Sequence, residues 1–177
     1  MKIIKTKFKD LIVVKQKNNT DKRGILREIF NNKILKKKFV FEYCTTSKKN
    51  VLRGFHFQTK FKQSKYVNVI KGKILDVVID LRKNSKTFGK IFKIILSKKN
   101  ALSLFVPAGF AHAYYSIEKE NIIYYKLDNY YSPKFEDGIT YNDKYLKIKW
   151  PKSKIITSKK DKNLLSFKEF KKKYKGL

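Results

Sequence analysis

The chain has 177 residues, 42% of them hydrophobic and 15% aromatic, which excludes a disordered chain and predicts a single domain over residues 1–177. Cys44 is the only cysteine, which excludes an internal disulfide framework and a thiolate metal cluster and fits a reducing compartment. The formal net charge is +30, but the 40 lysines are spread along the chain without a known nucleic-acid-binding motif, so we expect a solvated basic surface rather than nucleic-acid binding.

Short β-branched and aromatic runs, separated by polar or glycine-containing turns, dominate the sequence. This pattern is typical of an all-β sandwich or barrel. Turn signals occur at 18–21, 71–72 and 98–100, and a short helix is predicted at 31–38. In chain order the predicted strands are 11–15, 24–30, 39–45, 51–58, 65–70, 73–81, 90–96, 102–106, 111–116 and 122–127.

The end of the chain has a different periodicity. Leu164, Phe167, Phe170 and Tyr174 fall at helical spacing, with lysines between them and Gly176 beyond. This spacing predicts a C-terminal helix whose apolar side packs on the β-structure and whose lysines face water.

Nothing in the sequence indicates a membrane or secreted protein. No stretch approaches the roughly 18 apolar residues of a membrane span, and the first residues contain no hydrophobic run of signal-peptide length. We therefore expect a cytoplasmic protein without a membrane partner.

The chain has two histidines, and both lie among aromatic and basic residues. His56 is in the centre of the segment RGFHFQ at 53–58, and His112 ends the turn-like segment PAGFAH at 107–112. A single histidine in a strand is more often structural than catalytic. Two of them at strand starts indicate proton transfer, because imidazole titrates near neutral pH.

The spacing PxGxxH at 107–112 resembles the second conserved motif of cupins, which are double-sheet jelly rolls. Cupins that bind a metal usually supply two nearby histidines and a glutamate from their first motif, whereas Phe57 and Gln58 follow His56 here. Two imidazoles without a convergent carboxylate or thiolate make a poor metal site. We therefore expect neither a metal ion nor another cofactor.

A series of short motifs runs in order along nearly the whole chain. The motifs are DKRG at 21–24, VLRGFHFQ at 51–58, QSK at 63–65, DVVIDLR at 76–82, TFG at 87–89, VPAGFAH at 106–112, YK at 125–126, YYSP at 130–133, IKWP at 148–151 and SKKD at 158–161. Each motif is weak alone, but their common order is highly specific. This order resembles the dTDP-4-dehydrorhamnose 3,5-epimerases of nucleotide-sugar biosynthesis.

The resemblance implies a cupin-like, double-sheet jelly roll with short peripheral helices, including a C-terminal one. It also implies an isomerase that needs no cofactor and inverts C3 and C5 of a dTDP-linked 4-keto-6-deoxyhexose on the way to rhamnose or a related cell-surface sugar. The C4 carbonyl acidifies the C–H bonds at C3 and C5, so a base can remove a proton and leave an enolate. Reprotonation from the opposite face then inverts the carbon.

Four positions match the catalytic groups of the family. His56 resembles the base, and Asp161 resembles the carboxylate that fixes its tautomer and stabilises the imidazolium. Tyr125 matches the phenol that returns the proton from the other face. Lys65 matches the cation beside the oxyanion that develops at O4.

The resemblance also implies the groups that hold the substrate. Arg23 and Arg53 correspond to contacts with the diphosphate, which a guanidinium fork fits well. Glu28 and Tyr131 correspond to contacts with the nucleotide base, and the family often supplies its N-terminal segment to the partner subunit, which implies a homodimer with segment exchange. A supporting polar pair and a glutamine complete the substrate-binding set, which is Arg23, Glu28, Arg53, Gln58, Asp76, His112 and Tyr131.

Two of the catalytic positions raise questions of local structure. The two-residue period of a strand puts Arg53 and His56 on opposite faces, so a bulge or sharp twist near Gly54 is needed if both line one cavity. Asp161 falls in a lysine-rich segment that we expect to be a loop.

Several positions depart from the family. Phe41 and Tyr43 stand where a glutamine and an asparagine are expected near the nucleotide, so aromatic rings replace amide groups. Ser64 and Ala113 each replace a glycine, and the segment 58–65 is slightly short. These changes bear on the recognition of the base and the sugar.

Other functions remain open at this point. An epimerase that inverts only C3 or only C5, or that takes another nucleotide on the sugar, would keep the same fold. A non-catalytic basic cupin that binds polyanions and a metal-dependent cupin are rivals from other classes. A 3,4-ketoisomerase is expected to have a second histidine near His56, which Phe57 and Gln58 do not supply.

Overall fold

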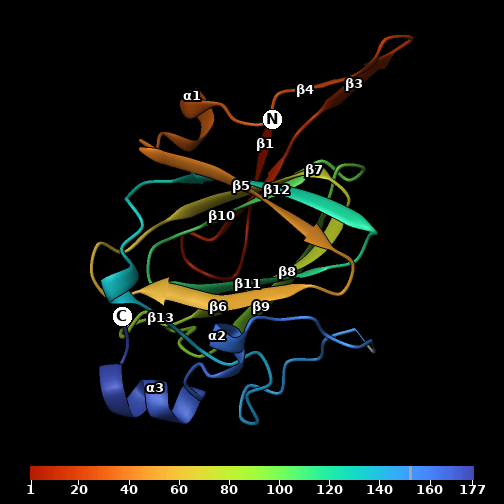
Figure 1. Ribbon diagram of the computed structural model, residues 1–177. Coiled ribbons are helices and arrows are strands. Elements are labelled where there is room, and N and C mark those ends of the chain that lie inside the picture. The colour runs from red at the N-terminus through yellow and green to blue at the C-terminus, as the bar shows by residue number, and fades with distance from the viewer. Residues whose placement is uncertain (152) are drawn as a thin grey trace.

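Two antiparallel β-sheets face each other and form the body of the molecule (Figure 1). The computed structural model describes residues 1–151 and 153–177. Over these residues one sheet has six strands, in the order β1 (Lys2–Lys5), β2 (Ile12–Lys15), β10 (Leu102–Val106), β7 (Lys65–Lys71), β12 (Glu120–Leu127) and β5 (Phe41–Lys48). The other has five, in the order β13 (Glu136–Gly138), β6 (Leu52–Gln58), β11 (Phe110–Ser116), β8 (Lys73–Asp80) and β9 (Ile91–Ser97). The prediction of an all-β, double-sheet jelly roll is confirmed.

The space between the sheets holds one hydrophobic core. Val67 of β7, Val78 of β8 and Leu104 of β10 are fully buried there, because their inward-facing positions alternate with outward-facing neighbours. Tyr114 and Tyr125 belong to the same core, so the apolar interior continues directly into the residues that surround the cavity described below.

The outer face of the five-stranded sheet is also buried, by the C-terminal part of the chain (Figure 1). Val77 and Ile79 of β8 point to this side and form a second core with Phe57 and Phe170. The rings of Phe57 and Phe170 meet edge-on with their centroids 5.4 Å apart. Because both faces of this sheet are covered, its central strands are nearly continuous apolar runs.

The predicted C-terminal helix is confirmed as α3 (Phe167–Tyr174). The helical spacing had included Leu164, but the helix begins at Phe167. Ser166 caps the helix by accepting a hydrogen bond from the Glu169 N–H, while the Glu169 carboxylate accepts one from the Ser166 N–H in return. This reciprocal cap fixes the first turn and turns Phe170 toward the sheet.

Residues 18–21, predicted as a turn, form the strand β3 (Asn18–Asp21) instead. This strand pairs with β4 (Gly24–Arg27) in a hairpin that projects away from the two sheets (Figure 1). The polar residues at 18–21 favoured a turn, because most strands bury one face and carry apolar residues on it. This hairpin is almost entirely exposed among the described residues, so its strands carry no apolar face of that kind. Its Leu26 is 70% exposed, which leaves an apolar side chain in water.

The other differences are at short elements. The helix predicted at 31–38 is only α1 (Asn32–Leu35), because Lys36 takes a left-handed conformation with φ of 49°. The segment around Asp161, expected to be a loop, forms α2 (Lys159–Lys162) with Ser158 as its cap. The strands β1 and β13 and the 3-10 helix η1 (Pro133–Phe135) were not predicted. The four residues of β1 are all exposed, and β13 and η1 have three residues each, so none of them shows a periodic pattern of apolar residues.

The bulge expected near Gly54 is present. His56 pairs with His112 and Arg53 pairs with Tyr114. A separation of three residues on β6 therefore matches a separation of two residues on β11. Gly54 has φ of +115°, and a Cβ there would lie 2.5 Å from the His112 carbonyl oxygen. The extra residue brings Arg53 and His56 to the same side of the sheet.

Among the described residues, no helix has the length and apolar character needed to cross a lipid bilayer.

Candidate active site

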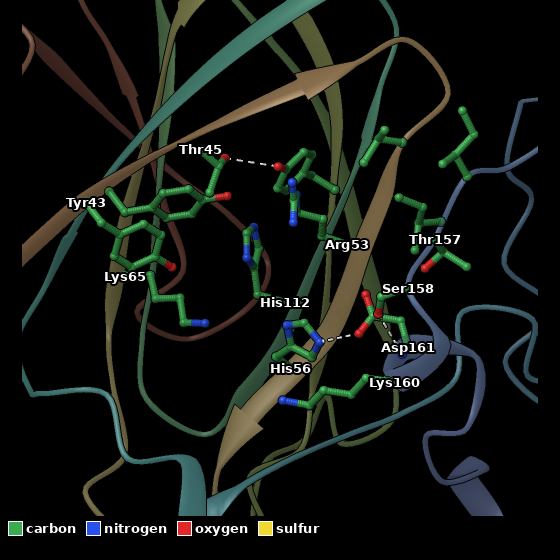
Figure 2. A pocket seen from close by; sticks show the side chains of 15 residues that line it. Tyr43, Thr45, Arg53, His56, Lys65, His112, Thr157, Ser158, Lys160 and Asp161 are labelled. Carbon is green, nitrogen blue, oxygen red and sulfur yellow. Dashed lines mark hydrogen bonds and ion pairs between the residues drawn. The ribbon is translucent and has the colours of Figure 1, made fainter.

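A cavity of about 560 Å³ opens between the two sheets and is lined from both (Figure 2). The five-stranded sheet supplies His56 and Arg53 from β6 and His112 from β11, while the six-stranded sheet supplies Lys65 from β7 and Tyr125 from β12. The helix α2 closes one side with Asp161 and Lys160.

His56 and Asp161 form a hydrogen-bonded pair. The imidazole Nε2 lies 2.8 Å from Asp161 Oδ1, and the other carboxylate oxygen accepts a hydrogen bond from the Gly54 N–H at 3.2 Å. Burial opposes ionisation of Asp161, but the bonds from His56, Gly54 and Ser158 outweigh it and lower the pKa of the carboxyl group. An ionised carboxylate only accepts hydrogen bonds, so Nε2 is the donor, and in the neutral form of the ring Nδ1 has the lone pair.

A second histidine–aspartate pair lies beside the first. His112 Nε2 is 2.9 Å from Asp76 Oδ2, and both side chains are buried. His112 is the cross-strand partner of His56, so the two imidazoles stand on neighbouring strands of one sheet and line the same cavity. The second oxygen of Asp76 is buried and has no hydrogen-bond partner among the described residues.

Lys65 and Tyr125 enter the cavity from the opposite sheet. Burial lowers the pKa of Lys65, although the carboxylates of Glu136 and Asp76 act against this shift. Burial also raises the pKa of Tyr125 well above its usual value of 10.0, so its phenol stays protonated. Its ring stacks on Tyr43 with centroids 4.8 Å apart and planes at 23°. Tyr43 is 36% exposed, but desolvation of its phenol and then the charges of neighbouring groups raise its pKa to about 12.

Arg53 lines the same cavity as Lys65 (Figure 2). Its Nε donates to Ser47 Oγ at 3.2 Å, and the Tyr114 hydroxyl lies within hydrogen-bond distance of both Ser47 and Thr45. These hydroxyl groups hold the guanidinium stem, and its terminal nitrogens, which bond no described residue, can meet an anion.

A smaller cavity of about 260 Å³ adjoins the first and shares Tyr43, His56 and Lys65 with it. Tyr131 lines it, and its hydroxyl donates to Glu136 at 2.9 Å. Gln58 also lines it, but its amide already bonds the backbone: Nε2 donates to the Phe61 carbonyl at 2.7 Å and Oε1 accepts from the Ser132 N–H at 2.7 Å. Gln58 thus fastens two loops at the cavity wall.

Arg23 and Glu28 do not reach either cavity within this chain. Arg23 lies at the turn of the β3–β4 hairpin, its side chain is 84% exposed, and it pairs with Asp21 at 2.6 Å. Glu28 accepts a hydrogen bond from Asn31 at 2.7 Å. The remaining predicted positions, which are His56, Lys65, Tyr125, Asp161, Arg53, Asp76, His112, Gln58 and Tyr131, line the two cavities or bond directly to a lining side chain.

Sequence reasoning missed three side chains of the site. Tyr43 was noticed only as a departure, although it forms the wall behind Tyr125. Lys160 and Glu136 form an ion pair next to the His56–Asp161 pair, and neither was selected. The position of Lys160 directly before Asp161 was the available signal, but it was lost among so many lysines.

No three His, Cys, Asp or Glu side chains are grouped so as to hold a metal ion within residues 1–151 and 153–177. What the cavity does bring together is an imidazole paired with a carboxylate, a protonated phenol and the amino group of a lysine. These are the groups required to move a proton on and off carbon next to a carbonyl.

The chain is similar to known proteins over nearly its full length. A family model described as dTDP-4-dehydrorhamnose 3,5-epimerase matches residues 5–169. The protein of that name from Methanothermobacter thermautotrophicus is 38% identical over 176 residues, which cover 95% of this chain and 95% of the relative.

Solved structures show the same likeness. The dTDP-4-dehydrorhamnose 3,5-epimerase from Bacillus anthracis, with TDP and PPi bound, is 38% identical to this chain and has a TM-score of 0.89. The match covers 93% of this chain and 98% of the Bacillus anthracis chain. The dTDP-6-deoxy-D-glucose-3,5-epimerase from Legionella pneumophila, in complex with dTDP-4-keto-L-rhamnose, is 35% identical to this chain and has a TM-score of 0.88. The match covers 92% of this chain and 90% of the Legionella pneumophila chain.

Proposed function

The chain belongs to the dTDP-4-dehydrorhamnose 3,5-epimerase family and is an isomerase, and on this premise we propose that it inverts C3 and C5 of a dTDP-linked 4-keto-6-deoxyhexose. The observation that carries the proposal is the pairing of His56 with Asp161 on one wall of a cavity whose opposite wall holds Tyr125 and Lys65. A base and an acid on two opposed sheets can act on the two faces of one sugar ring.

His56 acts as the base. Its Nδ1 takes the proton from C3 or C5, and the C–H electron pair moves toward C4 to form an enolate. Asp161 stabilises the resulting imidazolium, which is the role that its lowered pKa and its buried hydrogen bond support. The ammonium group of Lys65 lies in the same cavity and favours the enolate oxygen over the neutral ketone.

Tyr125 returns a proton to the other face of the carbon. Burial keeps its phenol protonated in the resting enzyme, and the stack on Tyr43 fixes the direction of its ring. Proton removal by His56 and proton delivery by Tyr125 together invert the carbon. His112, held by Asp76, supplies a further polar contact to the sugar at the same wall.

We further propose that the enzyme is a homodimer whose N-terminal hairpins are exchanged. Arg23 cannot reach the cavity of its own chain, since it lies on the projecting β3–β4 hairpin, and the apolar Ile25 and Leu26 beside it are exposed. In a dimer this hairpin covers the partner's cavity, buries its apolar residues and brings Arg23 to the substrate diphosphate. Glu28 at the base of the hairpin belongs to the same contact.

The proposed activity is tested with dTDP-4-keto-6-deoxyglucose in heavy water, with the C3 and C5 protons followed by NMR. We expect deuterium at both carbons together with formation of the inverted sugar. Exchange at one carbon alone would identify a single-carbon epimerase instead. No exchange with dTDP-, CDP- or GDP-linked 4-keto sugars would overturn the proposal.

A further inference from the structure

A wider hollow lies at one end of the two sheets, where four connections between strands meet. Its volume is about 1980 Å³, and the β3–β4 hairpin forms one side of it with Asn18 and Ile25. Seven lysines and two glutamates line it, which gives a formal charge of +5. Two lysines come from each of the β5–β6, β7–β8 and β9–β10 connections, and one comes from the β11–β12 connection. We call this hollow the lysine groove.

Most of the positive charge of the lysine groove is not neutralised within the described chain. Glu120 pairs with Lys71, and Glu118 lies 3.8 Å from Lys73. The side chains of both pairs are at least 43% exposed, so water weakens their attraction. The other five lysines of the groove form no ion pair with a described residue. The excess charge is therefore open to a mobile anion.

One buried side chain ties three of the four connections together. Asn121 is fully buried, and its Nδ2 donates to the carbonyl oxygen of Ser47 at 3.1 Å and to that of Glu118 at 2.9 Å. Its Oδ1 accepts a hydrogen bond from the Lys73 N–H at 3.0 Å. A fixed framework therefore carries the flexible lysine side chains and keeps their charges together.

The lysine groove adjoins the larger cavity near Arg53. Ile156 lines both hollows, so they meet at this residue. On β5, Thr45 lines the cavity, whereas the next two residues, Thr46 and Ser47, line the groove. Ser47 accepts the hydrogen bond from Arg53 at 3.2 Å. The positive charge of the groove thus continues to a guanidinium whose terminal nitrogens can meet an anion.

Screening by salt decides which lysines act on a ligand that approaches the cavity. The Debye length is about 8 Å at physiological ionic strength, so charges on remote faces of the molecule have little effect there, whereas the groove lies next to the cavity. The described residues that line the groove include neither an arginine nor an aromatic ring. Without guanidinium forks or stacking surfaces, the groove offers attraction rather than a fixed binding geometry.

We infer that the lysine groove is an electrostatic entry surface for the anionic ligand of the larger cavity. It attracts the diphosphate of a sugar nucleotide and raises the rate at which this group reaches Arg53. The inference rests on the proposed function in that the ligand is linked to dTDP and carries a charged diphosphate. Long-range attraction acts mainly on the rate of association, whereas short-range contacts in the cavity set the rate of dissociation.

Stopped-flow fluorescence with mant-labelled dTDP tests the inference without turnover. The variant Lys48→Gln/Lys49→Gln/Lys98→Gln/Lys99→Gln removes four exposed charges from the groove. At about 0.1 M ionic strength we expect its association rate constant to be about 5-fold lower than that of the wild type, with a dissociation rate constant within about 2-fold. At about 1 M the two association rates should be equal, because the Debye length falls to about 3 Å.

Two further variants are the controls, and circular dichroism checks that each is folded. The variant Lys83→Gln/Lys86→Gln/Lys168→Gln/Lys172→Gln removes the same number of charges from exposed positions on the outer side of the five-stranded sheet, away from the cavity. It should keep the wild-type association rate. Arginine at the four groove positions keeps the charge and should keep the rate as well.

Several results would overturn the inference. They are a wild-type association rate in the groove variant, an equal loss in the outer-side control or the arginine variant, a loss that persists at high salt, and failure of the wild-type protein to bind dTDP. A wild-type protein that binds dTDP but exchanges no deuterium into a dTDP-linked 4-keto sugar would contradict the proposed function instead. The association rates of dTDP would still decide the role of the groove.

Discussion

His56 and Asp161 are 105 positions apart in the chain, yet their side chains bond at 2.8 Å. Three local features make this possible: the bulge at Gly54, the cap of α2 by Ser158, and the bond from the Gly54 N–H to Asp161. The same glycine that turns His56 into the cavity also anchors its carboxylate partner. The imidazole therefore has one nitrogen fixed and the other open to a ligand.

Tyr125→Phe separates proton removal from inversion. The substitution deletes one hydroxyl and keeps the ring that stacks on Tyr43, so the cavity retains its shape. We expect deuterium exchange to persist at a measurable rate while formation of the inverted sugar falls by about 100-fold. Proton NMR of the sugar in heavy water measures both quantities in one sample. Equal loss of exchange and inversion would contradict the role of Tyr125 as the separate acid.

At the scale of elements, β6 is the strand on which the site depends. It carries Arg53 and His56, pairs with both β11 and β13, and lies against α2. Its bulge is needed because the strand must present two polar residues of opposite parity to one cavity while Phe55 and Phe57 fill the outer core. A regular strand would direct one of these polar side chains into that core.

Gly54→Ala should remove the activity by displacing this strand. The added Cβ would lie 2.5 Å from the backbone carbonyl oxygen of His112 and 2.7 Å from Ala113 Cα, and backbone atoms cannot move aside cheaply. We expect a loss of about 3 kcal/mol in the free energy of unfolding by urea and a large loss of exchange activity. Gly24→Ala is the matched control, since Gly24 also has a positive φ, of 131°, but apart from its chain neighbours no described residue has an atom within 4 Å of the added Cβ. Equal destabilisation by the two changes would contradict the role of the close contact.

The sequence predicted those elements that bury a face. The central strands and α3 were predicted because apolar residues repeat along them, and the need for a bulge followed from the parity of Arg53 and His56. The exposed strands β1 and β3 have no such repeat, and the polar residues of β3 favoured a turn. The proposed catalytic positions came from the order of motifs, whereas the Lys160–Glu136 pair depends on a contact between two segments that no local pattern reveals.

At the scale of the whole molecule, the fold separates the charges at the surface from those in the interior. Lysines cover the surface, while the buried carboxylates, such as Asp80 and Asp161, are held by specific partners. The two faces of the five-stranded sheet are both buried, one by the opposite sheet and one by the C-terminal segment. The cavity between the sheets is a place where a charged ligand can meet ordered polar groups.

Stability should fall at both ends of the pH range. Burial raises the pKa of Asp80, but bonds from Arg82, Ser85 and Thr87 outweigh it and lower the pKa, so the stability that Asp80 contributes is present above about pH 4 and is lost as the pH falls through its folded value. Burial raises the pKa of Tyr125, so its contribution is present below about pH 10 and is lost as the pH rises further. Urea unfolding across this range measures the effect. Asp80→Asn should flatten the acidic decline, and an unchanged decline in that variant would contradict its assignment to Asp80.

Mixed subunits test the proposed exchange of hairpins. Arg23→Ala removes the hairpin arginine and His56→Asn removes the base, so each variant alone should be nearly inactive. In a mixed dimer one site combines the intact cavity of the first variant with the intact hairpin of the second. Unfolding and refolding an equal mixture should restore about one quarter of the wild-type activity, because half of the dimers are mixed and each has one complete site. No recovery would contradict the exchange of hairpins.

Deuterium exchange by His56→Asn tests the assignment of the base most directly. The asparagine keeps a smaller polar side chain at this position but cannot take a proton from carbon. With circular dichroism showing that the fold is retained, we predict that the rate of deuterium entry at both C3 and C5 falls by at least about 1000-fold. Exchange at the wild-type rate in this variant would contradict the role of His56 as the base.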